Sequence, residues 1–372
     1  MKILITGAQG FVGKNLISEL RNQGFEELLE FDINLNNDQL ENFASKCNFV
    51  FHLAGVNRPE NTEDFMKGNF GFTSELLDLL KKYNNKAPVL ISSSIQAELD
   101  NPYGQSKKAG EDLMFAYSKE TKSSVFVYRL PNVFGKWCKP NYNSAVATFC
   151  NNIANNLPIH VNDPNVLMKL VYIDDVVGAF IKKLKNYSIN ESVIGRFEEV
   201  NPVHEIKLGE IVNLIHSFKE SRVTLLTPNL GDSFIKKLYS TYLSYLPTDN
   251  FSYFLKMNVD NRGSFTEFLK SPDRGQVSIN ISKPGITKGN HWHHTKNEKF
   301  LVVSGVGVIR FRKINSDQII EYYVSGEKME VVDIPVGYTH NIHNLGNSDM
   351  VTVMWVNEIF EKENPDTFYL EI

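Results

Sequence analysis

Histidines gather in the last third of this sequence. Of the nine histidines in 372 residues, five stand there, and three of those form the motif HWHH. Residues i and i+2 of a strand point to the same side, so His291 and His293 can approach one ion. Glu298 on the next strand and His340 after a Pro-x-Gly turn can complete the ligand set. Three imidazoles and one carboxylate predict a Zn²⁺ site, with Fe²⁺, Mn²⁺ and Ni²⁺ as alternatives.

A second group of residues suited to proton transfer is the motif YGQSK. Its tyrosine, Tyr103, and its lysine, Lys107, are four residues apart and would share one face of a helix. A phenol has an ordinary pKa of about 10, so it exchanges protons near neutrality only where a cation stabilises the phenolate. The ammonium of Lys107 can supply that charge and can also contact a nicotinamide ribose.

The glycine-rich stretch TGAQGFVG predicts a nucleotide site. Gly7, Gly10 and Gly13 directly follow a predicted strand and open a predicted helix. They permit a tight turn, a close approach to a pyrophosphate and close packing of the helix on the sheet, while the helix N-terminus attracts phosphate. Asp32 lies 19 residues after Gly13, where a carboxylate accepts a ribose 2′-hydroxyl and repels a 2′-phosphate. This position favours NADH over NADPH.

Two kinds of hydrophobic pattern along the chain predict two domains, and these domains must position the residues described above. In the first part, apolar runs alternate with helical patterns, which predicts a doubly wound α/β domain of the Rossmann type over residues 1–246. The strands are expected at 2–7, 27–33, 48–55, 87–94 and 124–130, and the helices at 11–24, 68–84 and 106–121. Short alternating strands with Gly and Pro turns then predict an antiparallel all-β domain over residues 247–372.

Charge and composition exclude several classes of function. The net charge of −4 divides into −1 for residues 1–246 and −3 for residues 247–372, so neither domain offers the clustered positive charge that nucleic acids require. The three cysteines are widely spaced and form no CxxC pair. No stretch approaches the roughly 20 apolar residues of a spanning helix, and no leader segment precedes the first strand. These features predict a cytoplasmic protein without membrane insertion.

The first domain resembles the extended short-chain dehydrogenase/reductase family over about residues 1–240. The resemblance rests on the GxxGxxG spacing, HLAG, NFGFT, ISSSI, YGQSK and RLPNVFGKW. It implies that Ser94, nine residues before Tyr103, orients the substrate oxygen while Tyr103 protonates a carbonyl as hydride reaches the carbon. The further residues that it implies are Leu53, Ala54 and Asn69 for the cofactor and Asn132 for a nucleotide sugar. Asn132 is equally explained by plain strand and loop packing.

The second domain resembles the cupins, which are jelly-roll barrels. The segment from Gly285 to Gly305 matches the first cupin motif, and PVGYTHNIHN resembles the second, although Met329 replaces its opening glycine. Upstream, DNRGSFTEF resembles the DxRGxFxE segment of sugar-nucleotide 3,5-epimerases, which implies that Arg262 and Glu267 line a substrate site. A turn with a solvated charge pair explains these two residues equally well.

Further stretches beyond these motifs are GVNRPE, CKPNYNS and STYLSYLP, together with the whole of residues 275–305. With them, the whole chain resembles the CapF family of capsular polysaccharide enzymes, in which a reductase precedes a metal cupin. The resemblance implies a homodimeric, NADPH-dependent, bifunctional enzyme for a UDP-linked keto-deoxy amino sugar. The cupin would epimerise C3 of a UDP-2-acetamido-2,6-dideoxy-4-hexulose, and the first domain would reduce its C4 ketone to UDP-N-acetyl-6-deoxytalosamine. Three alternatives stay open: a simple reductase with a zinc-stabilised dimerisation cupin, a cupin dioxygenase or isomerase for another substrate, and a nucleotide sensor. An intact Ser/Tyr/Lys set argues against the sensor.

Overall fold

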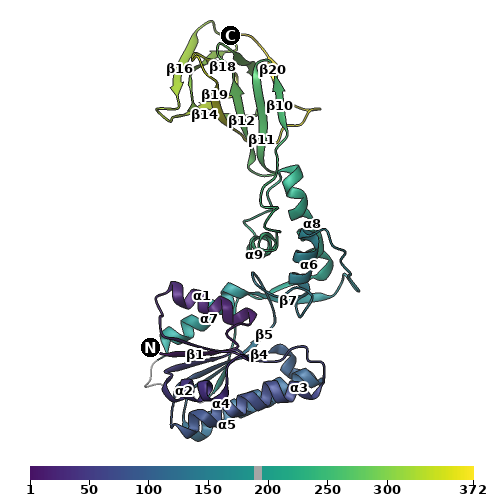
Figure 1. Cartoon of the computed structure of the whole chain (residues 1–372). Coiled ribbons are helices and arrows are strands. Elements are labelled where there is room, and N and C mark those ends of the chain that lie inside the picture. The colour runs from purple at the N-terminus through teal and green to yellow at the C-terminus, as the bar shows by residue number, and fades with distance from the viewer. Residues whose placement is uncertain (188–194) are drawn as a thin grey trace. The chain divides into compact units, whose positions relative to one another are not determined.

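The computed structural model describes residues 1–187 and 195–372, and the chain divides into two compact units (Figure 1). The first unit comprises Met1–His216 and Ser233–Pro247, and the second comprises Ser217–Asp232 and Thr248–Ile372. The main division therefore lies between Pro247 and Thr248, one residue from the predicted boundary between 246 and 247.

The segment Ser217–Asp232 belongs to the second unit, whereas the sequence places it in the first domain. The physical reason is backbone pairing. The amide of Thr227 donates to the carbonyl of Lys270, and the amide of Lys270 donates to the carbonyl of Leu225, each at 2.8 Å. These bonds join the segment to a strand of the second unit. Nothing in the local sequence pattern indicates such a non-local pairing.

The first unit is built on a parallel sheet, which confirms the predicted α/β class. Its strand order is β2-β1-β3-β4-β5-β8. The strands are β1 (Ile3–Thr6), β2 (Leu28–Phe31), β3 (Phe49–His52), β4 (Val89–Ser94), β5 (Val125–Leu130) and β8 (Arg196–Glu198). Because β2 and β3 lie on opposite sides of β1, the strand order reverses beside β1. In open α/β sheets, ligands bind outside the carboxyl ends of the strands at such a point.

Helices cover both faces of this sheet. Figure 1 shows α1 and α7 on one side of the sheet and α2, α4 and α5 on the other. These helices are α1 (Phe11–Asn22), α2 (Asn37–Lys46), α4 (Phe72–Lys82), α5 (Pro102–Thr121) and α7 (Ile173–Asn186). Successive residues of β1 alternate between the two cores: Ile3 and Ile5 pack with one helical layer and Leu4 with the other. This double burial explains why the strands are continuously apolar.

The remaining elements of the first unit were not predicted individually. A small sheet has the strand order β6-β7-β9. Its strands are β6 (Asn132–Phe134), β7 (Leu167–Tyr172) and β9 (His204–Lys207), and the neighbouring helices are α6 (Ala145–Ala154), α8 (Leu208–Thr224), which continues into the second unit, and α9 (Ser233–Leu243). Between β3 and α4 lie α3 (Glu63–Phe65) and the π-helix η1 (Met66–Gly71), and the 3₁₀-helix η2 (Ile95–Glu98) follows β4.

The second unit contains two antiparallel sheets, as the alternating strand pattern predicts. Their strand orders are β10-β11-β12-β19-β14-β17 and β16-β15-β18-β13-β20. The strands are β10 (Met257–Asp260), β11 (Gly263–Ser271), β12 (Gly275–Ser282), β13 (Thr287–Trp292), β14 (Glu298–Ser304), β15 (Val306–Lys313), β16 (Ile319–Ser325), β17 (Val331–Ile334), β18 (Tyr338–Asn344), β19 (Met350–Val356) and β20 (Phe368–Tyr369).

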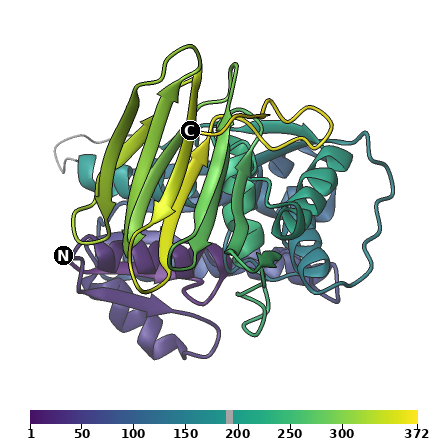
Figure 2. The same cartoon turned by 90° about the horizontal axis from the view of Figure 1, so that it is seen from above.

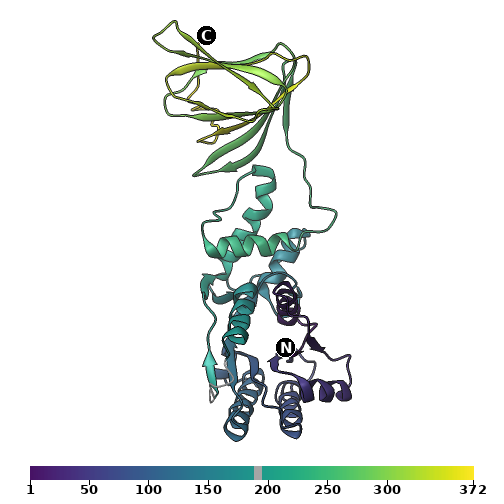
Figure 3. The ribbon, with the colours of Figure 1, turned by 90° about the vertical axis from the view of Figure 1, so that its left-hand side faces the viewer.

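These strands form a jelly-roll barrel. Figure 2 shows them side by side in green and yellow, and Figure 3 shows the two sheets facing each other. An apolar core that includes Phe300, Ile309, Phe311 and Ile342 joins strands of both sheets. In the described part of the chain, no helix is both long and apolar enough to span a membrane.

Phe180 on α7 offers a test of the first core. Its ring is fully buried and lies 4.9 Å from the ring of Tyr128 and 6.1 Å from that of Phe51, centroid to centroid. Phe180→Ala should lower the free energy of unfolding by about 3–5 kcal/mol, measured by chemical denaturation, because it removes buried surface and leaves a cavity. Phe254→Ala is the control, since Phe254 is fully exposed. Equal stability of the two variants would contradict this packing.

Candidate cofactor site and candidate metal centre

The glycine-rich turn lies between β1 and α1 at the carboxyl edge of the sheet. Gly7 has a φ of +70°, and a Cβ there would lie 2.7 Å from the backbone nitrogen of Ala54. A Cβ on Gly13 would overlap the carbonyl oxygen of Gly7. Gly10 forms the N-cap of α1 without a side-chain capping bond. The glycines therefore bring three backbone segments together and leave the first amides of α1 available for an anion.

Asp32 stands directly after β2, at the same edge of the sheet. Its Oδ2 accepts a hydrogen bond from the amide of Gln9 at 2.6 Å, and its Oδ1 accepts one from the amide of Ile33 at 2.8 Å. Gln9 belongs to the glycine-rich turn, so these bonds fix the carboxylate beside that turn. A carboxylate has about four lone-pair positions and is therefore able to accept further hydrogen bonds from a ligand.

Leu53 and Ala54 follow β3 on the other side of β1. Their amides donate to the carbonyl and the Oγ1 of Thr6, at 3.1 and 3.3 Å. The same Oγ1 bonds Nδ1 of the buried His52, whose Nε2 bonds the hydroxyl of Thr73 at 2.8 Å. Burial first, and then the charge of Lys107, lowers the pKa of His52 to about 3. This neutral imidazole holds the loop after β3 in a fixed position.

Asn69 lies in the π-helix η1 and connects this loop to α5. Its Oδ1 accepts from the amide of Val56 at 2.9 Å, and its Nδ2 donates to the hydroxyl of Ser106 at 2.9 Å. Ser106 in turn donates to the carbonyl of Tyr103 at 2.7 Å. Asn69 therefore positions the first turn of the helix that carries Tyr103 and Lys107. π-Helical turns occur frequently at functional sites.

Tyr103 and Lys107 lie on one face of α5, against the end of β4. Tyr103 hydrogen-bonds Ser94, and burial raises the pKa of its phenol, which this bond opposes. The Nζ of Lys107 donates to the carbonyl of Ser92 at 3.3 Å and lies 5.9 Å from the centroid of the Tyr103 ring. Burial lowers the pKa of Lys107 to about 8. The structure thus brings together the three predicted catalytic side chains.

The neighbouring serine has a different partner. Ser93 is buried and donates to Oε1 of Glu111 at 2.6 Å, whereas Ser94 hydrogen-bonds Tyr103. Glu111 is fully buried and forms a two-pronged ion pair with Arg129, at 2.9 and 2.7 Å. The charge of Glu111 also raises the pKa of Lys107 against the effect of burial. One face of α5 therefore contacts β4 through three side chains at four-residue spacing, which are Tyr103, Lys107 and Glu111.

Glu111 and Arg129 were not among the residues predicted for this site. The i+4 spacing that relates Tyr103 to Lys107 also relates Lys107 to Glu111, so the helical pattern contained a signal for the glutamate. Arg129 interrupts the apolar strand VFVYRL, and such a residue in a buried strand requires a buried partner. Together these two observations could have identified the pair.

The predicted metal ligands converge inside the second unit. One ligand atom from each of His291, His293, Glu298 and His340 lies within 4.8 Å of all the others. Nε2 of His340 lies 3.1 Å from Oε2 of Glu298, and Nε2 of His293 lies 3.6 Å from the same oxygen. His291 and His293 lie on or next to β13, Glu298 begins β14 and His340 lies on β18. The cluster therefore joins both sheets.

The protonation of this cluster suits a cation. Burial raises the pKa of Glu298, but the adjacent imidazoles of His293 and His340 lower it more, to about 2. Burial lowers the pKa of His291 to about 4. Nδ1 of His293 donates to the carbonyl of Asp366 at 2.6 Å, which leaves the lone pair on Nε2, and this buried atom has no hydrogen-bond partner among residues 1–187 and 195–372. These shifts favour a neutral His291 and an ionised Glu298, and zinc binds imidazole nitrogens and carboxylates in those protonation states.

The interior of the barrel is polar beside this cluster. Alternate residues of β12 are buried: Gln276, Ser278, Asn280 and Ser282. Asn280 faces the other sheet, because Nζ of Lys288 on β13 donates to its Oδ1 at 2.8 Å. The apolar alternates Val277, Ile279 and Ile281 are only half-buried on the outer face. The burial of the polar face of β12 was not predicted, because an alternating strand usually buries its apolar face.

The candidate substrate residues are more dispersed. Arg262 is exposed and forms an ion pair with Asp260 at 2.7 Å. Glu267 pairs with Lys270 at 2.8 Å and lies opposite Ser278, on the face of the sheet that also carries Glu298. Asn132, in the first unit, is exposed and donates to the carbonyl of Lys169 at 3.3 Å. The structure therefore aligns Glu267 with the polar interior and does not bring Arg262 to the metal ligands.

Comparisons with known proteins cover almost the whole chain. Residues 3–195 match the NAD dependent epimerase/dehydratase family, and residues 258–368 match the polysaccharide biosynthesis C-terminal domain. The chain is 45% identical over 368 residues to the UDP-2-acetamido-2,6-beta-L-arabino-hexul-4-ose reductase of Pseudomonas aeruginosa, covering 99% of this chain and 98% of the relative.

Solved structures extend the comparison. The crystal structure of the capsular polysaccharide assembling protein CapF from Staphylococcus aureus has a TM-score of 0.93 and 57% identity, and the match covers 100% of both chains. UDP-glucuronic acid 4-epimerase from Bacillus cereus, in complex with NAD, has a TM-score of 0.55 and 18% identity over 66% of this chain and 96% of its own, and this likeness shows the fold alone. The chain therefore belongs to the NAD dependent epimerase/dehydratase family and, within it, to the two-domain proteins related to CapF.

Proposed function

We propose that this chain is a bifunctional nucleotide-sugar enzyme that performs two consecutive steps on one sugar. The second unit epimerises C3 of a UDP-2-acetamido-2,6-dideoxy-4-hexulose. The first unit then reduces the C4 ketone to give UDP-N-acetyl-6-deoxytalosamine, a precursor of UDP-N-acetyl-L-fucosamine for capsular polysaccharide. The enzyme acts in the cytoplasm as a homodimer.

The observation that carries this proposal is the presence of two separately built sites in one chain. One combines a glycine-rich turn with Ser94, Tyr103 and Lys107, and the other combines three histidines with a carboxylate. The name of the Pseudomonas aeruginosa relative, a hexul-4-ose reductase, supports a UDP-linked 4-keto sugar as the substrate. The polar interior of the barrel supports a sugar rather than an apolar ligand, because hydroxyl groups need hydrogen-bond partners when they are buried.

In the reduction, a nicotinamide cofactor would supply the hydride for C4 of the sugar when bound. The hydroxyls of Ser94 and Tyr103 are hydrogen-bonded to each other, so both can hydrogen-bond the ketone oxygen of the sugar. Tyr103 transfers its proton to that oxygen as negative charge develops on it. The ammonium of Lys107 lies near the ring and stabilises the resulting phenolate. The Glu111–Arg129 ion pair keeps α5 in place beside β4.

In the epimerisation, the C3 proton is removed and returned on the other face of the ring. This proton is acidic only while C4 is a ketone, because the charge that forms is then shared with the ketone oxygen. A bound zinc ion would polarise such an oxygen. His291, His293, Glu298 and His340 would hold that ion. Reduction removes the ketone and ends the exchange, so epimerisation comes first.

We propose NADPH as the hydride donor, following the resemblance to the CapF family. NADH is the second candidate, because the carboxylate of Asp32 is fixed beside the glycine-rich turn and would repel a 2′-phosphate. A cation near that phosphate would be needed to overcome this repulsion.

A second candidate function is a simple reductase whose zinc cupin serves only for dimerisation. The outer face of the barrel favours it. Met257 and Val259 of β10 are 56% and 69% exposed, and they lie on the same face as the half-buried Val277 and Ile279 of β12. These apolar side chains flank the polar Ser264 and Thr266 of β11, and exposed apolar surface is typical of protein interfaces.

The proposal predicts that the full chain converts UDP-2-acetamido-2,6-dideoxy-4-hexulose with NADPH, and that NMR of the product shows inversion at C3. Tyr103→Phe should lower NADPH oxidation by about 10²–10⁴-fold, because the proton donor is lost. The same variant should still exchange the C3 proton with solvent deuterium. Tyr117→Phe is the control, since this tyrosine is on the same helix and its hydroxyl donates to the carbonyl of Asn85. Loss of C3 exchange in Tyr103→Phe would contradict the division of labour.

His291→Ala should abolish the bound zinc, measured by elemental analysis, because it removes one of four ligands. C3 exchange should be lost with the metal. His343→Ala is the matched control, because His343 hydrogen-bonds Thr287 and stands outside the cluster. One equivalent of zinc in His291→Ala would show that the ligands are misassigned. Wild-type rate and stereochemistry in a zinc-free His291→Ala protein would instead support the purely structural cupin.

Glu111→Gln should change the pH dependence of the reduction. The carboxylate of Glu111 raises the pKa of Lys107, so its neutralisation lowers that pKa below its present value of about 8. The ammonium that stabilises the phenolate is then lost at a lower pH, and the alkaline fall of kcat/KM shifts in the same direction. Glu98→Gln is the control, because Glu98 also pairs with Arg129 but is 68% exposed. Superimposable profiles for the wild type and Glu111→Gln would overturn this assignment.

A further inference from the structure

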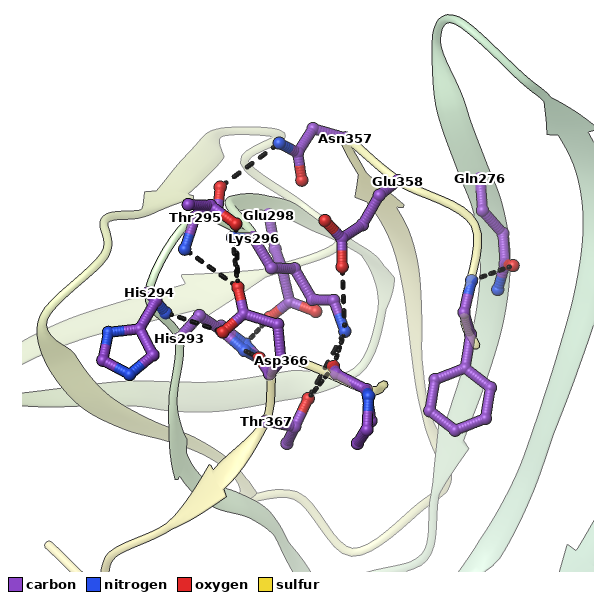
Figure 4. Close-up of polar contacts among 12 residues, drawn as sticks. Gln276, His293, His294, Thr295, Lys296, Glu298, Asn357, Glu358, Asp366 and Thr367 are labelled. Atoms are coloured by element: carbon purple, nitrogen blue, oxygen red, sulfur yellow. Dashed lines mark hydrogen bonds and ion pairs between the residues drawn. The ribbon is translucent and has the colours of Figure 1, made fainter. Parts of the chain in front are cut away.

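The C-terminal segment returns to the loop that carries the metal ligands of β13. Figure 4 shows the carboxylate of Asp366 directed at the loop from His294 to Lys296. Its Oδ1 accepts from the amide of His294 at 3.0 Å, and its Oδ2 accepts from the amides of Thr295 and Lys296, each at 2.8 Å. The hydroxyl of Thr295 adds a fourth bond at 3.1 Å. One side chain therefore binds three consecutive backbone amides.

The backbone of Asp366 contacts a metal ligand directly. Its carbonyl oxygen accepts a hydrogen bond from Nδ1 of His293 at 2.6 Å. A carbonyl can only accept, so this bond places the proton of His293 on Nδ1 and the lone pair on Nε2, next to Glu298. The same bond fixes the plane of the imidazole ring.

The residues on both sides of Asp366 are also anchored. Lys296 is only 4% exposed, and its Nζ donates to the carbonyl of Pro365 and to the hydroxyl of Thr367 and pairs with Glu358 at 3.5 Å. Directly after Thr367, β20 pairs with His291 and Trp292 of β13. Asp366 itself adopts a φ of +38°, which an aspartate tolerates better than most residues. The surrounding bonds therefore hold its carboxylate and its carbonyl in place together.

We propose that Asp366 is a positioning residue of the metal centre. Its carboxylate clamps the loop after His293, and its carbonyl keeps His293 in the tautomer and orientation that bind a metal. This inference rests on the proposed metal site. It extends that site to a residue 73 positions away from His293.

The expected effect follows from the general behaviour of residues that orient metal ligands. Removing such a partner typically lowers metal affinity by about 10–100-fold. A merely structural role would instead lower the stability of the metal-free and the zinc-loaded protein equally. A positioning role also reduces the stabilisation that zinc adds, because binding to the folded state is weaker.

The test uses full-length protein with zinc or cobalt alone as the probe. Asp366→Ala should bind zinc about 10–100-fold more weakly than the wild type in competition with a chelator. It should also show a smaller zinc-induced rise in Tm and an altered visible spectrum of bound Co²⁺. Asp366→Asn, which keeps one side-chain acceptor, should fall between the two. Glu363→Ala is the matched control, because Glu363 is an exposed acidic residue of the same segment.

The outcomes separate this inference from the metal site on which it depends. A wild-type protein that binds no zinc would refute the metal site itself. A wild type that binds zinc, together with an Asp366→Ala protein of equal affinity and identical Co²⁺ spectrum, would overturn the role of Asp366 alone. If Asp366→Ala does not fold, Asp366→Asn decides, and wild-type affinity and spectrum in that variant would overturn the proposal.

Discussion

Both candidate sites depend on one constraint, which is that a carboxylate buried away from water must be compensated by nearby positive charge or hydrogen-bond donors. In the first unit, Glu111 is fully buried and is compensated by Arg129 and Ser93. In the second, Glu298 is compensated by His293 and His340. If the elements moved apart, either carboxylate would lose its partners and would remain as an uncompensated buried charge. This energetic cost keeps the surrounding elements together. The electrostatics of these candidate sites therefore also hold their elements together.

The fold supplies the convergence that each site needs. In the first unit, β1 lies where the strand order reverses, so the turn after β1 and the loop after β3 meet at one edge of the sheet. Their contact is possible only because Gly7 has no side chain, since a Cβ there would lie 2.7 Å from the backbone of Ala54. In the second unit, pairing of β13 with β18 brings His291 opposite His340. Ordinary strand pairing therefore assembles ligands that are distant in sequence.

Local periodicity explains what the sequence could predict. The strands of both units, the glycine-rich turn and the Tyr103–Lys107 pair follow from spacings of two, three and four residues, which a short window of sequence contains. The candidate metal ligands could be identified in a similar way, because His291 and His293 are two residues apart and Glu298 and His340 begin or follow recognisable strands. The ligand set could be proposed without knowledge of the register.

What the sequence could not predict depends on contacts between distant segments. Asp366 stands in the unremarkable stretch ENPDTFY, and only the return of the C-terminal segment brings it to His293. The pairing of Leu225 and Thr227 with Lys270 has the same character. The direction in which the polar face of β12 points could not be predicted for another reason. The strand alternates as expected, but its polar face is inside, and only the contact between Lys288 and Asn280 reveals which face is enclosed.

The different surroundings of the two sites match the two kinds of chemistry proposed for them. Burial lowers the pKa of Lys107 to about 8, so its ammonium is still the main form near neutral pH and can stabilise a phenolate. The metal cluster instead lies beside Gln276, Ser278 and Asn280, whose side chains can hydrogen-bond a polar ring. A single site would have to satisfy both requirements around one ketone, holding its oxygen for proton loss at C3 and then exposing C4 to hydride. In the proposed reaction sequence, two sites in one chain avoid that conflict, because the ketone that would enable the first step would be consumed only in the second.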